Sequence, residues 1–234
     1  LSKEKRNNMT YVFSDVHGFW GEYIDFLDAV NFSDKDTLYI IGDIIDRGSE
    51  GIKILQDVMT RKNVFLIKGN HELMILPALD ELSYSDKSTQ LEIIRDEVNM
   101  TPIGQEDTLK DFCQLNRKEQ ILIIDYLNSL PLYQEIIVNS QKYLLVHAGL
   151  PDFNNVMDLD FYTEDDLLFG PHDFSINHFD DTIVIVGHQP TRFISGAEPD
   201  KIFKSLDSIA IDCGLGFGGK LGVLCLETGE ELYF

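Results

Sequence analysis

Short apolar runs that stop at polar residues and glycine dominate the first third of the chain. Three of them occupy residues 11–18, 37–48 and 63–72 and read YVFSDVHG, TLYIIGDIIDRG and NVFLIKGNHE. Each begins with β-branched and aromatic residues, a composition typical of a buried strand. Each ends in acidic, amide or imidazole side chains beside a glycine, which a strand that only buries itself does not require.

The segments between these runs have a helical period. Residues 20–32 and 49–62 each place apolar side chains three or four positions apart, on one face of a helix. The order strand, helix, strand, helix, strand predicts right-handed βαβ crossovers and a mostly parallel sheet. In such a sheet, functional groups collect at the carboxyl ends of the strands.

The remainder of the chain divides into a helical part and a second β part. Residues 74–130 read as amphipathic helices with polar breaks such as TPIGQED, and predict a mainly helical insertion lying over the sheet. From Leu132 the β pattern returns, with turn signals at NSQ and ETGE, and predicts a second, partly antiparallel sheet. The fold class is therefore α/β, a four-layer α/β/β/α sandwich of two mixed sheets flanked by helices. Without a linker or repeat, residues 1–234 are expected to form a single domain.

Composition narrows the possible partners and the compartment. Hydrophobic residues make up 44% of the chain, enough for a sizeable core, while 19 basic against 40 acidic residues give a net charge of −21. This charge argues against non-specific nucleic-acid binding and against anchoring on anionic membranes. The three cysteines form no C-x-x-C pair, and no signal peptide or membrane-spanning run is visible. These features predict a cytoplasmic protein.

Candidate ligands for metal ions follow five of the predicted strands. Asp15 and His17 project from the same face of the first strand, because alternate residues share a face. Mixed carboxylate, imidazole and amide groups suit Mn, Fe or Zn rather than the soft metals of thiolate sites. A single strand-end histidine or aspartate is more often an ordinary satisfied polar group, but five such strand ends together favour a site for two divalent ions. Its predicted ligands are Asp15, His17, Asp43, Asn70, His147 and His188.

The motifs SDVHG, GDIIDRG, GNHE, VHAGL and VGHQPT together resemble the calcineurin-like metallophosphoesterase superfamily. They are most similar to its phosphoprotein phosphatase family, in the bacterial and phage branch, over about residues 11–226. The resemblance implies that one ion is held by Asp15, His17 and Asp43, and that Asp43 bridges to a second. It implies a hydrolase of phosphate monoesters acting by direct attack of a metal-bridging hydroxide, with Mn as the first choice of metal. The second ion would be held by Asp43, Asn70, His147 and His188.

The resemblance also implies roles for residues beside the metals. Arg47, together with Asn70 and His71, would contact the phosphate, since its planar guanidinium matches phosphate oxygens. His71, oriented by Asp46, would protonate the leaving group; the alternative is that His71 is a plain metal ligand. Glu72 is expected to cap the helix that follows it.

The substrate is less constrained than the chemistry. The sequence favours a serine/threonine protein phosphatase over a symmetrical bis(5'-nucleosyl)-tetraphosphatase, because the latter typically lacks an acid at Asp46 and reads GNHD rather than GNHE. A third reading, a binding protein that has lost catalysis, is disfavoured by the complete ligand set. Gly170 and Pro171 stand where a second phosphate-binding arginine is expected, and Arg192 or His172 is a candidate replacement from its position. The remaining histidine, His178, is expected with His172 to be solvated in a polar loop.

Overall fold

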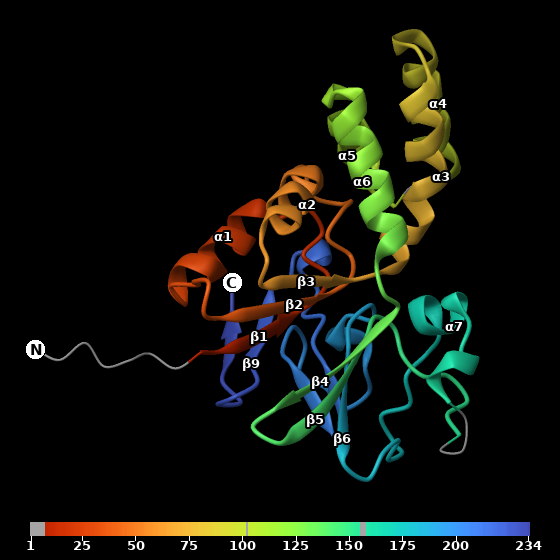
Figure 1. The fold of residues 1–234 in the computed structure, drawn as a ribbon. Helices are drawn as coiled ribbons and strands as arrows, with labels where there is room; N and C mark the ends of the chain where they lie inside the picture. The colour runs from red at the N-terminus through yellow and green to blue at the C-terminus, as the bar shows by residue number, and fades with distance from the viewer. Residues whose placement is uncertain (1–7, 102, 155–157) are drawn as a thin grey trace, which may run out of the picture.

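The strands form two five-stranded sheets in a computed structural model that describes residues 8–101, 103–154 and 158–234. In the first sheet the order is β10-β9-β1-β2-β3, and in the second it is β4-β5-β6-β8-β7 (Figure 1). Both sheets mix parallel and antiparallel pairs, so the predicted pair of mixed sheets flanked by helices is confirmed. The first sheet contains β1 (Thr10–Phe13), β2 (Thr37–Ile41), β3 (Val64–Ile67), β9 (Gly222–Cys225) and β10 (Glu231–Tyr233). The second contains β4 (Tyr133–Val138), β5 (Gln141–Val146), β6 (Thr182–Val186), β7 (Phe203–Ser205) and β8 (Ser208–Ala210).

Among the described residues, six α-helices lie on the outer side of the first sheet, where the first two cover it, and a short one lies against the second sheet (Figure 1). The helices α3 to α6 account for the predicted helical stretch and stand away from the sheet. The six are α1 (Trp20–Ala29), α2 (Gly51–Thr60), α3 (Asn70–Tyr84), α4 (Lys87–Met100), α5 (Glu106–Gln114) and α6 (Arg117–Ser129). The short helix is α7 (Glu164–Phe169).

Alternation along the strands separates the hydrophobic cores. Phe13 of β1 points into the core beneath the helices, whereas its neighbour Val12 points between the two sheets. Val12 meets Leu145 and Ile185 there, which belong to the second sheet. Because each inner strand buries both faces, its apolar run is continuous, and a polar residue interrupts it only at the exit.

The predicted hairpin turns are confirmed. Asn139 and Ser140 join β4 to β5 with positive φ values of 48° and 69°, the conformation of the two-residue turn that matches strand twist. Gly229, with φ of 72°, serves the same purpose between β9 and β10. In the part of the chain that the structure describes, no helix is both long and apolar enough to cross a membrane.

Candidate active site

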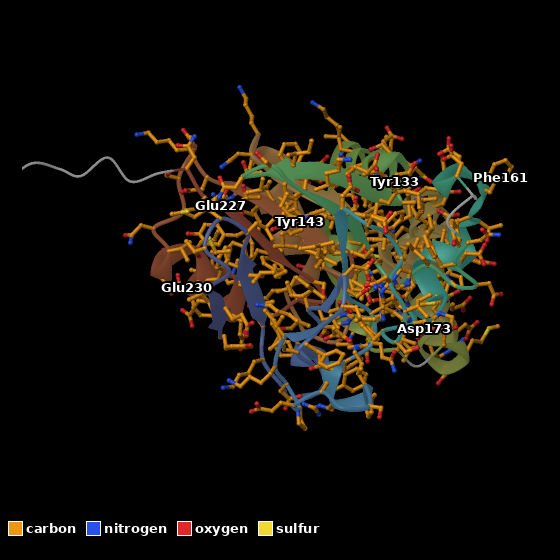
Figure 2. The ribbon with its side chains drawn as sticks, turned by 90° about the horizontal axis from the view of Figure 1, so that it is seen from below. Tyr133, Tyr143, Phe161, Asp173, Glu227 and Glu230 are labelled. Carbon is orange, nitrogen blue, oxygen red and sulfur yellow. The ribbon has the colours of Figure 1, made fainter. Side chains whose placement is uncertain are left out.

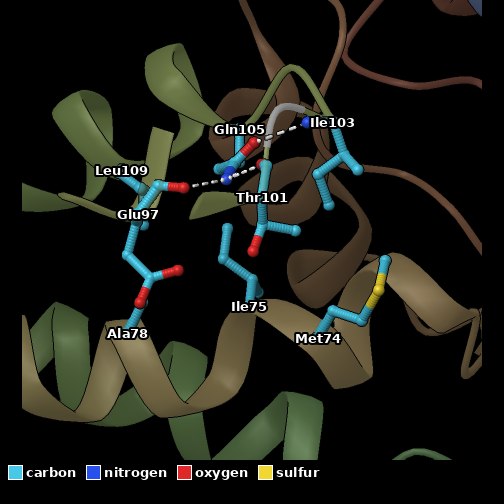
Figure 3. Close-up of a pocket in the computed structure, with 8 residues that line it drawn as sticks. All are labelled: Met74, Ile75, Ala78, Glu97, Thr101, Ile103, Gln105 and Leu109. Atoms are coloured by element: carbon cyan, nitrogen blue, oxygen red, sulfur yellow. Dashed lines mark hydrogen bonds between the residues drawn. The ribbon is translucent and has the colours of Figure 1, made fainter. Parts of the chain in front are cut away.

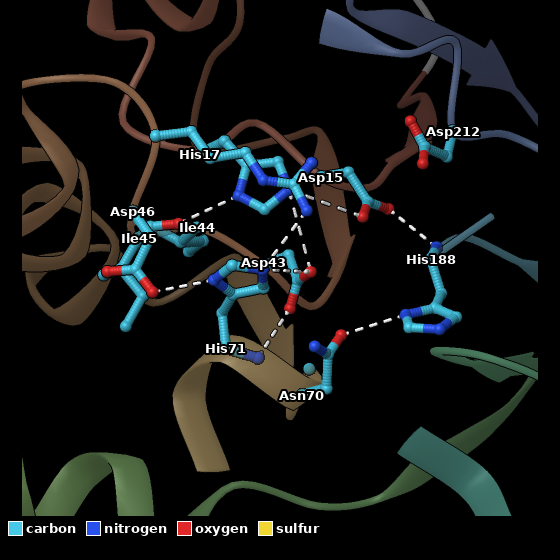
Figure 4. A network of polar contacts seen from close by, with 12 residues as sticks. Asp15, His17, Asp43, Ile44, Ile45, Asp46, Asn70, His71, His188 and Asp212 are labelled. Carbon is cyan, nitrogen blue, oxygen red and sulfur yellow. Dashed lines mark hydrogen bonds and ion pairs between the residues drawn. The ribbon is translucent and has the colours of Figure 1, made fainter. Parts of the chain in front are cut away.

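We call the residues that directly follow the carboxyl end of a strand its exit. The exits of β1, β2 and β3 lie close to those of β5 and β6 at one edge of the sandwich (Figure 4). Two groups of side chains there place their ligand atoms within 4.8 Å of one another, the spacing needed to share an ion. One group is His17, Asp43 and His71, and the other is Asp43, His147 and His188. Asp43 belongs to both groups, the position that the sequence predicts for a bridging ligand.

His17 of the first group presents an imidazole lone pair to the carboxylates of Asp43 and of Asp15, which lies next to the group. Nε2 of His17 lies 3.8 Å from Oδ1 of Asp15 and 3.7 Å from Oδ2 of Asp43. Nδ1 of His17 donates to the carbonyl oxygen of Ile45 at 2.9 Å, which fixes the tautomer and leaves Nε2 unprotonated. Nε2 is buried and has no hydrogen-bond partner among the described residues. A divalent ion fits these donors, since it would satisfy Nε2 and both carboxylates.

The second group is arranged around the amide of Asn70. Its Oδ1 lies 2.8 Å from Nε2 of His147 and 2.9 Å from Nδ1 of His188. His147 already donates Nδ1–H to the carbonyl oxygen of Ile41 at 2.8 Å, so its Nε2 offers a lone pair. Oδ1 of Asp43 lies 3.5 Å from that nitrogen. The convergence of lone pairs from an amide, two imidazoles and a carboxylate fits a second ion.

The electrostatics of the cluster also fit cations. Burial, followed by the nearby carboxylates of Asp15 and Glu72, raises the pKa of Asp43 well above its usual value. Burial holds the pKa of His17 at about 3, so this imidazole is neutral and able to act as a ligand. Asp15 is also buried, which acts to raise its pKa, but His147, His17 and hydrogen bonds outweigh burial and the pKa is lowered. Ionised carboxylates this deeply buried need a positive partner.

Backbone strain concentrates at the same residues. Six of the predicted site residues adopt the left-handed conformation, which costs a non-glycine residue about 1–3 kcal/mol. Hydrogen bonds between exits offset this cost: the amide of Asp15 donates to Gly42 O at 3.1 Å, and that of His17 to Asp43 O at 2.9 Å. Strain maintained in this way is typical of functional sites. The six are Asp15, His17, Asp43, Asp46, Arg47 and His188.

The predicted capping role of Glu72 is confirmed, and its carboxylate also binds backbone amides of a neighbouring loop. Its Oε2 accepts from the amide of Gly69 at 2.9 Å, at the N-terminus of α3. The same carboxylate accepts from the amides of Asp43 at 2.8 Å and Ile44 at 2.9 Å, in the loop that leaves β2. Glu72 is completely buried and therefore ties the Asp43 backbone to the start of the helix that carries Asn70.

His71 of the first group is hydrogen-bonded to two further residues, Asp46 and Arg47, and the three form a connected set. Nδ1 of His71 donates to Oδ2 of Asp46 at 2.7 Å, the geometry predicted for an orienting carboxylate. A guanidinium N–H of Arg47 donates to Nε2 of His71 at 3.3 Å, and the guanidinium lies over the Phe217 ring at 4.3 Å. His71 Nε2 is also 3.8 Å from Oδ2 of Asp43, so both of its predicted roles, acid and metal ligand, remain geometrically open.

Residues of the helical stretch hold this set in place, which the sequence does not reveal. Thr108 of α5 accepts from the amide of Asp46 at 3.0 Å, and the carbonyl of Gly104 accepts from the amide of Arg47 at 2.8 Å. Gln105 is buried and stabilises this loop by donating to the Glu97 and Thr101 carbonyls. A cavity of about 240 Å³ lies behind the loop, between α3, α4 and α5 (Figure 3). The polar break TPIGQED signals a loop, but not which residues it touches.

Replacing Thr108 by valine is expected to shift Asp46, because it removes the hydroxyl that accepts from the Asp46 amide while the side chain keeps its size. The change leaves a buried amide unsatisfied, which costs about 1–3 kcal/mol of folding free energy. Because the Asp46 backbone is already strained, we also expect kcat to fall, by up to roughly 100-fold if the pair with His71 shifts. Urea unfolding and steady-state kinetics measure the two effects. Thr108→Ser retains the hydroxyl and is the matched control; a valine variant with the kcat of this control would contradict the positioning role.

Asp212, which follows β8, is a further acidic residue that sequence reasoning missed. It is buried near Asp15, and burial together with that carboxylate raises its pKa well above the usual value. Its Oδ1 accepts from the amide of Gly214 at 2.8 Å. The signal was available, because the segment SIAIDCG repeats the pattern of an apolar run that ends in an acid near glycine.

One prediction about the 170–192 region is wrong. His172 and His178 are buried, not solvated: their rings stack at 4.3 Å, and His172 Nε2 is 2.8 Å from Ser208 Oγ. The loop that carries them folds back onto β8, so its histidines pack inside. The replacement of the expected phosphate-binding arginine by Arg192 or His172 stays a prediction. In the structure the Arg192 guanidinium is paired with Asp200 at 2.6 Å.

Comparison with known protein families and curated proteins gives consistent matches. The family model for calcineurin-like phosphoesterases matches residues 10–215. Bis(5'-nucleosyl)-tetraphosphatase, symmetrical, of Wigglesworthia glossinidia brevipalpis is 30% identical over 142 residues, covering 60% of this chain and 44% of that protein. The protein of the same name from Coxiella burnetii is 29% identical over 166 residues, covering 70% of this chain and 50% of that protein. The chain therefore spans half or less of the length of these relatives.

Solved structures share the fold at lower identity. A protein named as a candidate diadenosine tetraphosphatase superposes with a TM-score of 0.68 and 18% identity, covering 98% of this chain and 94% of the other. A protein serine/threonine phosphatase from Saccharomyces cerevisiae gives 0.62 and 16%, covering 97% and 75%. At these identities the likeness concerns the fold alone.

Proposed function

The chain belongs to the calcineurin-like phosphoesterase family, and on that premise we propose that it is a metal-dependent hydrolase of symmetrical dinucleoside tetraphosphates. The observation that carries the hydrolase is the convergence of six ligand side chains from five strand exits on two adjoining points. The curated relatives, which are symmetrical tetraphosphatases, support the substrate. The oxygen of water would bond to one of the two central phosphorus atoms, and the bond from that phosphorus to the oxygen that bridges the two would break. The bridging oxygen would leave with the other phosphorus, and the water would release its protons, so that the products are two nucleoside diphosphates.

The residues of the site divide the work of this reaction. When bound, two divalent ions supply charge stabilisation for phosphoryl oxygens and lower the pKa of the attacking water. We propose that Asp15, His17, Asp43, Asn70, His147 and His188 hold them. Arg47, placed by Gly104 and Phe217, would contact the phosphoryl oxygens with its guanidinium fork. Where a leaving group needs a proton, His71 would carry one on Nε2 in place of the hydrogen bond that this atom accepts from Arg47, and Asp46 would stabilise the imidazolium.

This substrate reverses the preference drawn from the sequence. That preference relied partly on Glu72, as GNHE rather than GNHD, but Glu72 is buried and binds backbone amides of Gly69, Asp43 and Ile44. Glu72 therefore joins the loops that follow β2 and β3, and its identity is no evidence on which substrate those loops bind. The curated relatives favour the tetraphosphatase alternative over the serine/threonine phosphatase.

A second candidate substrate is a phosphate monoester of serine or threonine. The contact of 2.7 Å between His71 and Asp46 favours it, because an alkoxide is a poor leaving group and needs a proton. A nucleoside diphosphate leaves more readily and depends less on an acid. The pair is thus better explained by a monoester than by an anhydride.

A side-by-side assay decides between the two substrates. We expect the Mn-loaded protein to convert diadenosine tetraphosphate to two molecules of ADP faster than it releases phosphate from a phosphoserine or phosphothreonine peptide. p-Nitrophenyl phosphate serves as the general control for a working centre. Rapid phosphopeptide hydrolysis with negligible dinucleotide cleavage would establish the second candidate instead. Inactivity on all three substrates, with two ions bound, would contradict both.

A further inference from the structure

A cavity of about 260 Å³ has His188 in its wall, and neither Arg47 nor His71 is among the residues that line it. Phe169, at the end of α7, and Pro171 line it together with Gln189 and Pro190, which follow His188 in the chain. The cavity therefore begins at a proposed metal ligand and is walled largely by apolar and aromatic side chains. None of the roles assigned above uses Phe169 or Gln189.

The described lining residues place no cation on this wall. Position 170 has no room for a side chain, because a Cβ there would overlap the carbonyl oxygen of Asp166 and the ring of Pro151. The arginine expected at this point of the chain is thus excluded by packing and not merely absent. His172 turns its Nε2 to Ser208, and burial keeps its pKa at about 3, so it is neutral. A wall without positive charge is poorly suited to a phosphate group.

Phe169 offers this wall an aromatic surface. Its side chain is 41% exposed, although phenylalanine is a residue type that is usually buried. The ring meets the His188 imidazole edge to face, with centroids 6.3 Å apart and an interplanar angle of 83°. Contact with a fixed imidazole orients the ring, and the rest of its surface stays available to a planar ligand.

A second cavity, of about 750 Å³, shares Pro171 and His172 with the first as lining residues. Phe153 and Ile176 add apolar surface there, and Asp152 and Asp173 add carboxylates. Carboxylates accept hydrogen bonds from hydroxyl and amino groups but repel phosphates. The two cavities, called the groove from here on, together offer the volume of a sugar with its base, and the carboxylates that line the second one disfavour a polyphosphate there.

We propose that Phe169 is the base-stacking residue of a nucleoside subsite, in which a nucleobase of the substrate packs on its ring beside His188. The amide of Gln189 lies on the same wall and supplies a donor and an acceptor for a base edge. This inference rests on the proposed function, since it names where one nucleoside of the dinucleotide lies. The phosphate chain would run from the groove toward the proposed metal ligands and Arg47.

The test compares two inhibitors that differ in the presence of a nucleoside. ADP and pyrophosphate are each added as an inhibitor of p-nitrophenyl phosphate hydrolysis by the Mn-loaded protein, and their inhibition constants are measured for the wild type and for Phe169→Ala. We expect the constant for ADP to rise by roughly fivefold or more, the loss typical of a base that stacks on an aromatic ring. The constant for pyrophosphate should stay within about twofold, since no base is lost.

Two further variants complete the experiment. Phe169→Trp keeps a stacking surface and should retain the wild-type ADP constant. Phe161→Ala removes another exposed phenylalanine, which is 75% exposed at the edge of the molecule and is not among the residues that line the groove; it should change neither constant (Figure 2). Metal content and melting temperature show whether each variant is folded and loaded.

Each pattern of results decides the inference. Equal rises for ADP and pyrophosphate in Phe169→Ala would overturn it, because Phe169 would then act only by supporting His188. Unchanged constants for both inhibitors would overturn it as well. If the wild type does not cleave diadenosine tetraphosphate but Phe169→Ala loses ADP inhibition selectively, the nucleoside subsite is supported and the proposed function fails.

Discussion

Replacing Asp43 by asparagine is expected to remove both metal ions and nearly all activity. Among the described residues, Asp43 alone belongs to both groups of potential ligands, with Oδ2 3.7 Å from His17 Nε2 and Oδ1 3.5 Å from His147 Nε2. Loss of an outer-shell partner already costs roughly 10–100-fold in metal affinity or activity, and we expect a shared ligand to cost more. Elemental analysis after dialysis against Mn²⁺ measures the ions directly, and p-nitrophenyl phosphate turnover measures the chemistry.

Stability separates ligand loss from misfolding in this variant. Asparagine keeps the Oδ1 that accepts from the His71 amide at 3.0 Å, and it removes a buried charge that faces Asp15 and Glu72. With chelator present, Asp43→Asn should therefore melt at or above the wild-type temperature, whereas Mn²⁺ should stabilise only the wild type. Asp36→Asn is the control, a buried aspartate whose carboxylate binds the Met9 and Ser33 amides away from the site. Two retained ions with near-normal turnover in Asp43→Asn would refute the bridging role.

Replacing His71 by asparagine is expected to slow the hydrolysis of alkyl phosphates by about 10²–10⁴-fold. The same change should affect p-nitrophenyl phosphate far less, because nitrophenolate leaves without a proton. Diadenosine tetraphosphate should behave like the nitrophenyl ester, since its leaving group is a diphosphate. Rates for the three substrates under metal saturation give the comparison directly.

Asp46→Asn extends this prediction to the partner of His71. Because Oδ2 of Asp46 accepts Nδ1–H of His71 at 2.7 Å, its loss should reproduce the same dependence on leaving group, to a smaller extent. If His71→Asn instead slows all three substrates equally and loses an ion, His71 is a metal ligand. That outcome agrees with its place beside His17 and Asp43 in the first group.

The strands of the first sheet, and the polar residues that follow them, can be predicted from local sequence. The strands β1, β2 and β3 are recognisable because each reads as an unbroken apolar run whose side chains are mostly buried, although Phe65 of β3 is half-exposed. The ends of those runs are recognisable because Asp15, Asp43 and Asn70 do not belong in a buried strand. The parallel crossovers then place these exits at one edge of the sheet, whatever the details of packing.

Other features depend on contacts between distant parts of the chain, which no local pattern encodes. Thr108 reaches Asp46 from 62 residues away, and the amide of His188 reaches the Asp15 carboxylate across 173 residues. The burial of His172 and His178 depends on a polar loop packing against Ser208, although the loop itself has no apolar period. The polar sequence of this loop therefore predicted solvent-exposed histidines, whereas in the tertiary structure they are buried against other residues.

The sequence by itself determined the chemistry of this protein: which side chains end the strands and, through their ligand types, that divalent ions suit them. Only the tertiary structure decided how the site is held and what surrounds it. In the tertiary structure the buried Glu72 links the loops that follow β2 and β3. Phe169 is partly exposed beside His188, and there is no space for a side chain at Gly170. The physical reason is that ligand type is a property of one residue, whereas position, burial and free space are set by every neighbour that the fold brings together.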